Sequence, residues 1–141
     1  MESDSARRAV TIERTGPGRL TVTNARGGQL SFGDGDGTEF SPTELLLAAI
    51  GGCTAIDIDV LTTRRAEPDS FEVTVAGDKV RDQSGNRLTG IEVTFRLVFP
   101  ATEQGDRARA ILPDAVRQSH DRLCTVGRTV ELGTPIATAI A

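Results

Sequence analysis

Aromatic residues are scarce in this 141-residue sequence, which has five phenylalanines and neither tyrosine nor tryptophan. Proteins that bind single-stranded nucleic acid stack the bases on aromatic side chains, and this composition offers few such surfaces. The formal net charge is -4, whereas nucleic-acid-binding domains usually carry a basic excess or a basic stripe. We therefore expect no nucleic-acid partner.

Residues that ligate metals are also few, because the sequence has two cysteines, Cys53 and Cys124, and one histidine, His120. A structural zinc site needs about four ligands, and these three residues form neither a CxxC nor an HxxxH spacing. We expect no metal and no cofactor. His120 is expected to be exposed on a surface helix, since a general base would have to lie beside a nucleophile.

Long apolar segments are missing from the pattern as well, since no apolar run reaches the ~18 residues that span a bilayer. The N-terminal residues MESDSARR contain no apolar stretch of the kind found in secretory signals. We therefore expect a cytoplasmic protein without a membrane partner. Cytosolic disulfides are usually transient and catalytic, which favours a redox pair over a structural disulfide for Cys53 and Cys124.

The sequence is 38% hydrophobic and 26% charged, which fits one globular domain over residues 1–141. Alternating patterns and turn residues predict a chain of short strands and two helical segments. The predicted strands cover 8–13, 19–23, 29–32, 70–75, 90–100 and 134–140, and the helical segments 42–65 and 102–123. This order is typical of an α+β fold.

The clearest local signal is the tetrapeptide Ser41-Pro42-Thr43-Glu44, which predicts the start of a helix. Ser41 suits the N-cap, and Glu44 can reach back to the Ser41 backbone in a capping box. The next residues are apolar on nearly every face, which indicates burial on several sides. Gly51 and Gly52 cost about 2 kcal/mol relative to alanine in a helix. Tight packing or a site that needs room beside Cys53 must offset that cost.

The second helical segment contains Pro113, which is expected to kink the helix or to split it in two. Cys124 comes after this segment and can begin a new helical turn, where exposed N–H groups favour the thiolate. From position alone, Cys53 and Cys124 can equally be small buried apolar residues.

The segment SPTELLLAAIGGCTAID, from Ser41 to Asp57, resembles the helix that carries the first cysteine in proteins of the OsmC/Ohr family. Pro42 precedes Cys53 by eleven residues, and a Leu/Ala-rich run with small residues leads into the cysteine. Cys124 falls where the family places its second cysteine, after a helix and before a terminal strand. The element order agrees from about residue 8 to the end of the chain.

The resemblance implies an intertwined homodimer with an α+β fold, in which sheets from both subunits wrap two long central helices. It also implies an oxidoreductase activity, the thiol-dependent reduction of organic hydroperoxides or of hydrogen peroxide. Cys53 would become a sulfenic acid, Cys124 would condense with it to a disulfide, and a dithiol, for some members a lipoylated protein, would restore both thiols. The alternatives are a binding protein or a redox sensor on the same fold, without peroxide turnover.

Active family members also use an arginine from the N-terminal strands, held by a glutamate near the start of the cysteine helix. Counting from Pro42, Thr43 occupies the usual glutamate position, and Glu44 is one residue later. We take Glu44 as the candidate glutamate. The candidate arginines are Arg19, which we prefer, then Arg14 and Arg26.

Asp57 is one helical turn after Cys53, so a carboxylate is expected beside the thiol and should raise its pKa. The GGCTAID pattern resembles a divergent branch of the family whose members can lack the arginine and glutamate pair.

Overall fold

The structure is a computed structural model that describes residues 5–141; residues 1–4, at the start of the N-terminal segment considered above, lie outside it. The contacts within the chain divide it into one unit that ends at Leu46 and a second unit, Leu47–Ala141. Each unit is described by itself. The single domain expected over residues 1–141 stays a prediction.

The first unit holds a three-stranded antiparallel sheet in the order β1-β2-β3. The strands are β1 (Val10–Gly16), β2 (Arg19–Asn24) and β3 (Gln29–Gly33). The tight turn between β1 and β2 contains Gly18 at φ +64°, a conformation that favours glycine because it has no Cβ. The predicted strands 19–23 and 29–32 are confirmed, whereas β1 begins two residues later than expected.

The predicted capping box is confirmed. The Ser41 N–H donates to Glu44 Oε1 at 3.0 Å, and the Glu44 N–H donates to Ser41 Oγ at 3.2 Å. These two bonds satisfy backbone donors that the first turn of a helix would otherwise leave unpaired. Helix α1 (Pro42–Thr63) begins here in the first unit and continues into the second.

Among residues 5–141, α1 is the one helix long and apolar enough to cross a membrane, with a mean hydropathy of 1.8 over 18 residues. The helix reaches this length and mean hydropathy although Glu44, Asp57 and Asp59 interrupt its apolar run. Core helices of globular proteins also have this length and hydropathy, but only 28% of this window of α1 is buried. A Cβ added at Gly51 would clash with Val75 Cγ2, so the first of the two mid-helix glycines is explained by tight packing. A Cβ added at Gly52 would have no atom within 4 Å, so packing does not explain the second glycine.

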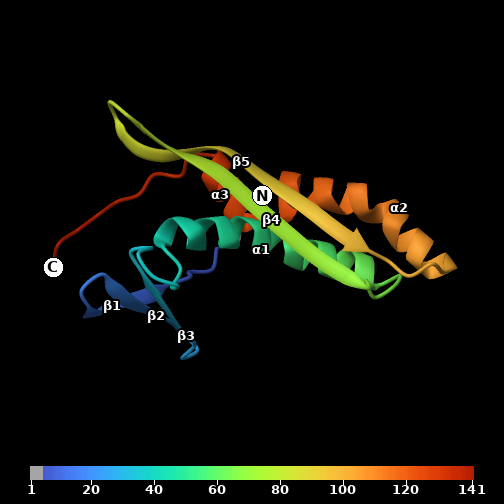
Figure 1. Cartoon of the computed structure of the whole chain (residues 1–141), viewed down its shortest axis with the longest axis horizontal. Coiled ribbons are helices and arrows are strands. Elements are labelled where there is room, and N and C mark those ends of the chain that lie inside the picture. The colour runs from blue at the N-terminus through green and yellow to red at the C-terminus, as the bar shows by residue number, and fades with distance from the viewer. Residues whose placement is uncertain (1–4) are drawn as a thin grey trace. The chain divides into compact units, whose positions relative to one another are not determined.

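Strands β4 (Ser70–Asp82) and β5 (Gly85–Val98) form a long antiparallel hairpin that lies across the helices of the second unit (Figure 1). Both strands are longer than predicted, because the ladder continues through a polar stretch to the turn at Gln83-Ser84. Half-buried and exposed residues alternate along both strands. The half-buried set faces the helices and includes the cross-strand pairs Val73–Phe95 and Val75–Val93.

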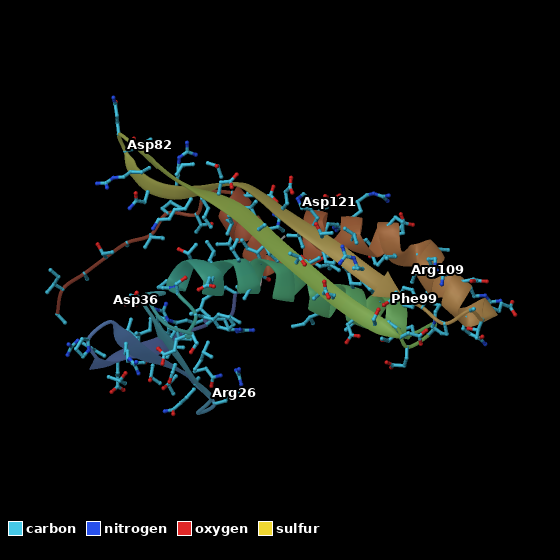
Figure 2. The ribbon with its side chains drawn as sticks, in the orientation of Figure 1. Arg26, Asp36, Asp82, Phe99, Arg109 and Asp121 are labelled. Carbon is cyan, nitrogen blue, oxygen red and sulfur yellow. The ribbon has the colours of Figure 1, made fainter. Side chains whose placement is uncertain are left out.

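Helix α2 (Glu103–Gln118) begins with Thr102 as its N-cap and is followed by a π-helical turn, η1 (Ser119–Leu123), and by α3 (Thr125–Glu131). Arg109 donates to the Phe99 carbonyl at 3.2 Å and so links α2 to the end of the hairpin (Figure 2).

The expected split at Pro113 is wrong, since α2 runs through this residue without interruption, and the alternative of a kink stays a prediction. Ala108 and Ala115, on either side of the proline, are buried at 0% and 2% exposure. Their packing holds the helix together although one backbone bond is lost, as tertiary contacts often override local propensity. The irregular turn comes later, at η1.

The strand predicted over 134–140 is also wrong, because the segment has no strand partner within the described residues. Alternation of side chains is not sufficient for a strand, since the backbone N–H and C=O groups need a neighbouring strand. Ile136 and Ile140 are 89% and 102% exposed.

Candidate dithiol site

Cys53 and Cys124 both belong to the second unit, and the Cys124 side chain is close enough to Cys53 to raise the pKa of the Cys53 thiol. Cys53 lies in the middle of α1, and Cys124 lies between η1 and α3. Both are free thiols; Cys53 is partly exposed and Cys124 is 2% exposed. The fold thus brings together two residues that are far apart in the sequence.

The start of α3 presents backbone N–H groups to both sulfur atoms. The Gly127 N–H donates to Cys124 Sγ at 3.2 Å, with Cys124 as the N-cap of α3, and the Val126 backbone N–H is close enough to Cys53 to act against the rise in its pKa. The prediction that Cys124 begins a new helical turn is confirmed. Such N–H groups stabilise a thiolate relative to a thiol.

The pKa of Cys53 is nevertheless raised above its ordinary value. Burial is the main cause, and the neighbouring Cys124 and the Asp57 carboxylate add to it, whereas the Val126 N–H acts in the opposite direction. The expected effect of Asp57 is confirmed. A nucleophilic Cys53 thiolate therefore needs additional positive charge at the site.

Asp57 is not an isolated carboxylate. Its Oδ2 accepts a hydrogen bond of 2.8 Å from the hydroxyl of Ser119, a residue that is 0% exposed. Ser119 opens the η1 turn, and its carbonyl accepts the Cys124 N–H at 2.8 Å. The sequence alone assigned no role to Ser119. The sequence signal that could have indicated this role is the Ser119 hydroxyl, which continues the apolar face formed by Ala108 and Ala115 in α2.

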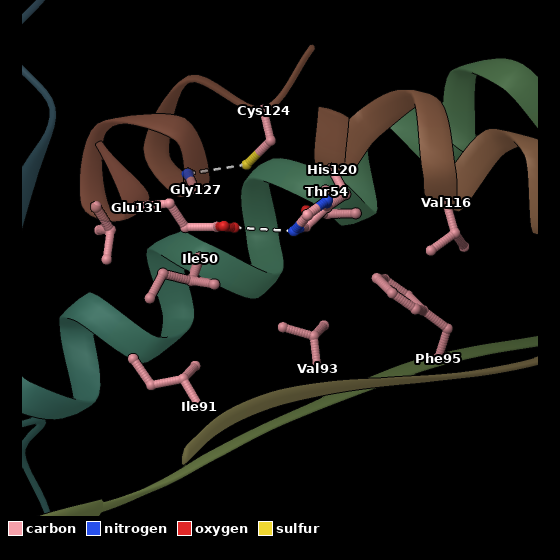
Figure 3. Close-up of a pocket in the computed structure, with 11 residues that line it drawn as sticks. Ile50, Thr54, Ile91, Val93, Phe95, Val116, His120, Cys124, Gly127 and Glu131 are labelled. Atoms are coloured by element: carbon pink, nitrogen blue, oxygen red, sulfur yellow. Dashed lines mark hydrogen bonds and ion pairs between the residues drawn. The ribbon is translucent and has the colours of Figure 1, made fainter. Parts of the chain in front are cut away.

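A cavity of about 480 Å³ lies beside Cys124, between α1, β5 and the α2–α3 segment (Figure 3). Its walls are mainly apolar, with Ile50 from α1, Val93 and Phe95 from β5, and Val116 from α2. Cys124 is the thiol that lines it. This space can hold a small molecule with an apolar body close to a sulfur atom.

His120 and Glu131 add an ion pair to the cavity wall, with 2.9 Å between His120 Nε2 and Glu131 Oε1 (Figure 3). His120 is exposed, as expected. It also contacts Asp121 at 3.0 Å, and the hydrogen bond to Asp121 and the charge of Glu131 raise its pKa. The sequence did not predict this pair.

The remaining candidates lie in the first unit. Arg19 is exposed and forms an ion pair of 3.9 Å with Glu39, while Glu44 caps α1. Ser41 lowers the Glu44 pKa through hydrogen bonds of its backbone and side chain. Arg14 is exposed on β1, and Arg26 is exposed at the turn between β2 and β3 (Figure 2). The catalytic roles of these residues stay predictions.

Within residues 5–141, no group of three or more His, Cys, Asp or Glu side chains is arranged to hold a metal ion.

An α+β chain with two contacting free thiols beside an apolar cavity has the architecture of a dithiol protein. The family described as OsmC-like protein matches residues 33–139 of the sequence, and the chain belongs to this family. A comparison with curated proteins found no match.

Solved structures support the fold. A hypothetical protein from Aquifex aeolicus VF5 has a TM-score of 0.72 and 21% identity, over 92% of this chain and 91% of that one. An OsmC-like protein of unknown function from Vibrio cholerae has a TM-score of 0.72 and 13% identity, over 90% and 95%. The organic hydroperoxide resistance protein OhrB of Bacillus subtilis has a TM-score of 0.54 and 19% identity, over 88% and 90%.

Proposed function

We propose that this protein is a thiol-dependent hydroperoxide reductase in which Cys53 and Cys124 form the reactive pair. The contact between the two free thiols carries this proposal, because a disulfide can form only between cysteines that are already close. Membership of the OsmC-like family, whose structural neighbours include a hydroperoxide resistance protein, supports it.

In the proposed reaction, the Cys53 thiolate attacks the outer oxygen of a hydroperoxide and the O–O bond breaks. Cys53 becomes a sulfenic acid, and the departing alkoxide takes a proton and leaves as an alcohol. The Cys124 sulfur then attacks Cys53, which releases water and forms the disulfide. A dithiol reductant, such as a lipoylated protein, reduces the disulfide and is itself oxidised to a disulfide.

The apolar cavity beside Cys124 favours organic hydroperoxides over hydrogen peroxide, because an apolar body can leave water and fill it. Since burial and Asp57 disfavour the Cys53 thiolate, the proposed reaction also needs a cation. We assign this role to Arg19, whose exposed side chain forms a 3.9 Å ion pair with Glu39, and we assign Glu44 to orient it.

We also propose that the protein acts as a homodimer in the cytoplasm. Helix α1 exposes Ile56 at 68% and Val60 at 50%, one turn apart. The small residues Ala48 and Gly52 also leave room for the close approach of another helix. An apolar helix face of this kind is typical of a surface that a partner covers.

The proposal is tested by following consumption of cumene hydroperoxide, tert-butyl hydroperoxide and hydrogen peroxide, with dithiothreitol or dihydrolipoamide as reductant. Turnover should be lost in Cys53→Ser, whereas Cys124→Ser should accumulate a sulfenic acid that dimedone traps. Arg19→Ala should lower kcat/KM more than the matched Arg14→Ala and Arg26→Ala variants. Turnover retained in Cys53→Ser would overturn the proposal.

The second candidate is a binding or redox-sensing protein on the same fold. The raised pKa of Cys53 favours it, because a thiol that is mostly protonated reacts slowly with peroxides. In that case the purified protein consumes no peroxide, and an apolar ligand in the cavity beside Cys124 protects the protein against thermal unfolding.

A further inference from the structure

Ser119 links the two cysteine-bearing segments by two hydrogen bonds. Its hydroxyl donates to Asp57 Oδ2 at 2.8 Å, and its carbonyl accepts the Cys124 N–H at 2.8 Å. The side chain of Ser119 is completely buried, so water cannot replace the bond to Asp57 from the Ser119 side. Ser119 thus joins Asp57 on α1 to the backbone of Cys124.

The bond from the Cys124 N–H to the Ser119 carbonyl spans five residues, which is the spacing of a π-helix. In a regular α-helix that carbonyl would accept from the residue before Cys124. The wider turn inserts one residue, which rotates the next residues by about 100° around the helix axis. The orientation of Cys124 therefore depends on an unfavourable turn that begins at Ser119 and needs an external contact to hold it.

Asp57 supplies that contact from the same face of α1 that carries Cys53, since the two residues are one helical turn apart. The Asp57–Ser119 bond and the Cys53–Cys124 contact are thus parallel links between α1 and the segment that leads into α3. We propose that Asp57 and Ser119 are a positioning pair that holds the Cys124 thiol against Cys53 for disulfide formation. This inference rests on the proposed dithiol function and names the residues on which its second step depends.

Asp57 has two effects that a substitution can separate: it accepts the hydrogen bond from Ser119, and its charge disfavours the Cys53 thiolate. Its charge raises the Cys53 pKa, along with burial and the Cys124 side chain, and only the Val126 N–H opposes them. A neutral acceptor at residue 57 would keep the bond to Ser119 and remove the charge. Asp57→Asn should therefore preserve the position of Cys124 while making Cys53 easier to ionise.

The test measures disulfide formation driven by diamide, an oxidant that converts two thiols to a disulfide without any peroxide step. Ser119→Ala and Asp57→Ala should each slow closure of the Cys53–Cys124 disulfide by about tenfold, as expected for the loss of a hydrogen bond of about 1.4 kcal/mol. The matched controls are Asp59→Ala, an exposed carboxylate two residues along α1, and Thr129→Ala, a hydroxyl in α3. Both controls should close at the wild-type rate.

Asp57→Asn keeps the bond to Ser119, so its disulfide should close at least as fast as that of the wild-type protein, and the pH profile of Cys53 alkylation should shift to lower pH. If Asp57 only stabilised the fold, Asp57→Asn would not recover disulfide closure while also changing the pH profile of alkylation. Normal closure in Ser119→Ala, or no rescue by Asp57→Asn in a folded protein, would overturn the positioning pair. Absence of peroxide turnover with normal diamide closure in the wild-type protein would instead overturn the proposed function alone.

Discussion

His120 and Glu131 form an ion pair of 2.9 Å that joins the η1 turn to the end of α3. The other ring nitrogen of His120 lies 3.0 Å from Asp121, so the imidazole contacts two carboxylates. These contacts hold one wall of the cavity beside Cys124. The geometry of that wall should therefore depend on whether His120 is protonated.

The pKa of His120 is predicted to lie above its ordinary value, first because of the hydrogen bond to Asp121 and then because of the charge of Glu131. A raised pKa in the folded protein means that the stability contribution is fully present below the unfolded pKa. It is lost as the pH rises through the folded pKa. As the protein has one histidine, proton NMR of its ring signals measures the pKa directly.

Glu131→Gln should lower the His120 pKa, whereas Glu103→Gln, on the first turn of α2, should leave it unchanged. A wild-type value at or below about 6.5, the ordinary value for histidine, would contradict the ion pair.

Gly51→Ala is predicted to destabilise the protein by up to about 2 kcal/mol, because the clash with Val75 outweighs the better helix propensity of alanine. In a Val75→Ala background the clashing methyl group is absent. There the same substitution should stabilise the protein by up to about 1 kcal/mol. Urea unfolding of the four proteins of this double-mutant cycle gives the coupling. An equal effect of Gly51→Ala in both backgrounds would show that α1 does not pack closely on β4.

Ile56→Glu is predicted to convert the proposed homodimer to a monomer, since it places a charge on the exposed apolar face of α1. Light scattering coupled to size-exclusion chromatography measures the mass. The matched control is Thr74→Glu, on the exposed face of β4, which should leave the dimer intact. A dimer that persists in Ile56→Glu would mean that this face of α1 is not the interface.

Ser41→Ala is predicted to cost about 1 kcal/mol, because the Glu44 N–H loses its capping acceptor. Thr43→Ala, an exposed neighbour in the first turn, is the control and should have a smaller effect. Chemical unfolding at neutral pH compares the two variants. Equal losses of stability would argue against the capping box.

Glu44→Gln should make the stability less sensitive to acid. The lowered pKa of Glu44 means that its contribution is present above the unfolded pKa and is lost as the pH falls through the folded pKa. Thermal unfolding between neutral pH and about pH 3 tests this, with the wild-type protein losing more stability than the variant across that range. A loss of kcat/KM at an unchanged melting temperature would assign Glu44 to the reaction as well as to the cap.

Elements whose signals are local could be predicted well. The start of α1 depends on Ser41 and Glu44, three residues apart, and the strand over 19–23 on a regular alternation. The errors concern long-range contacts. Pro113 does not break α2, because residues on both sides are buried, and the segment 134–140 forms no strand, because no strand partner lies beside it among the described residues.

The sequence by itself determined the α+β class, the cysteine helix and the family resemblance, since these depend on short-range patterns that a chain carries before it folds. Only the tertiary structure brought Cys53 and Cys124 into contact and joined Asp57 to Ser119. Both contacts cross more than sixty residues, and they depend on a π-helical turn that packing imposes and that local propensity does not favour.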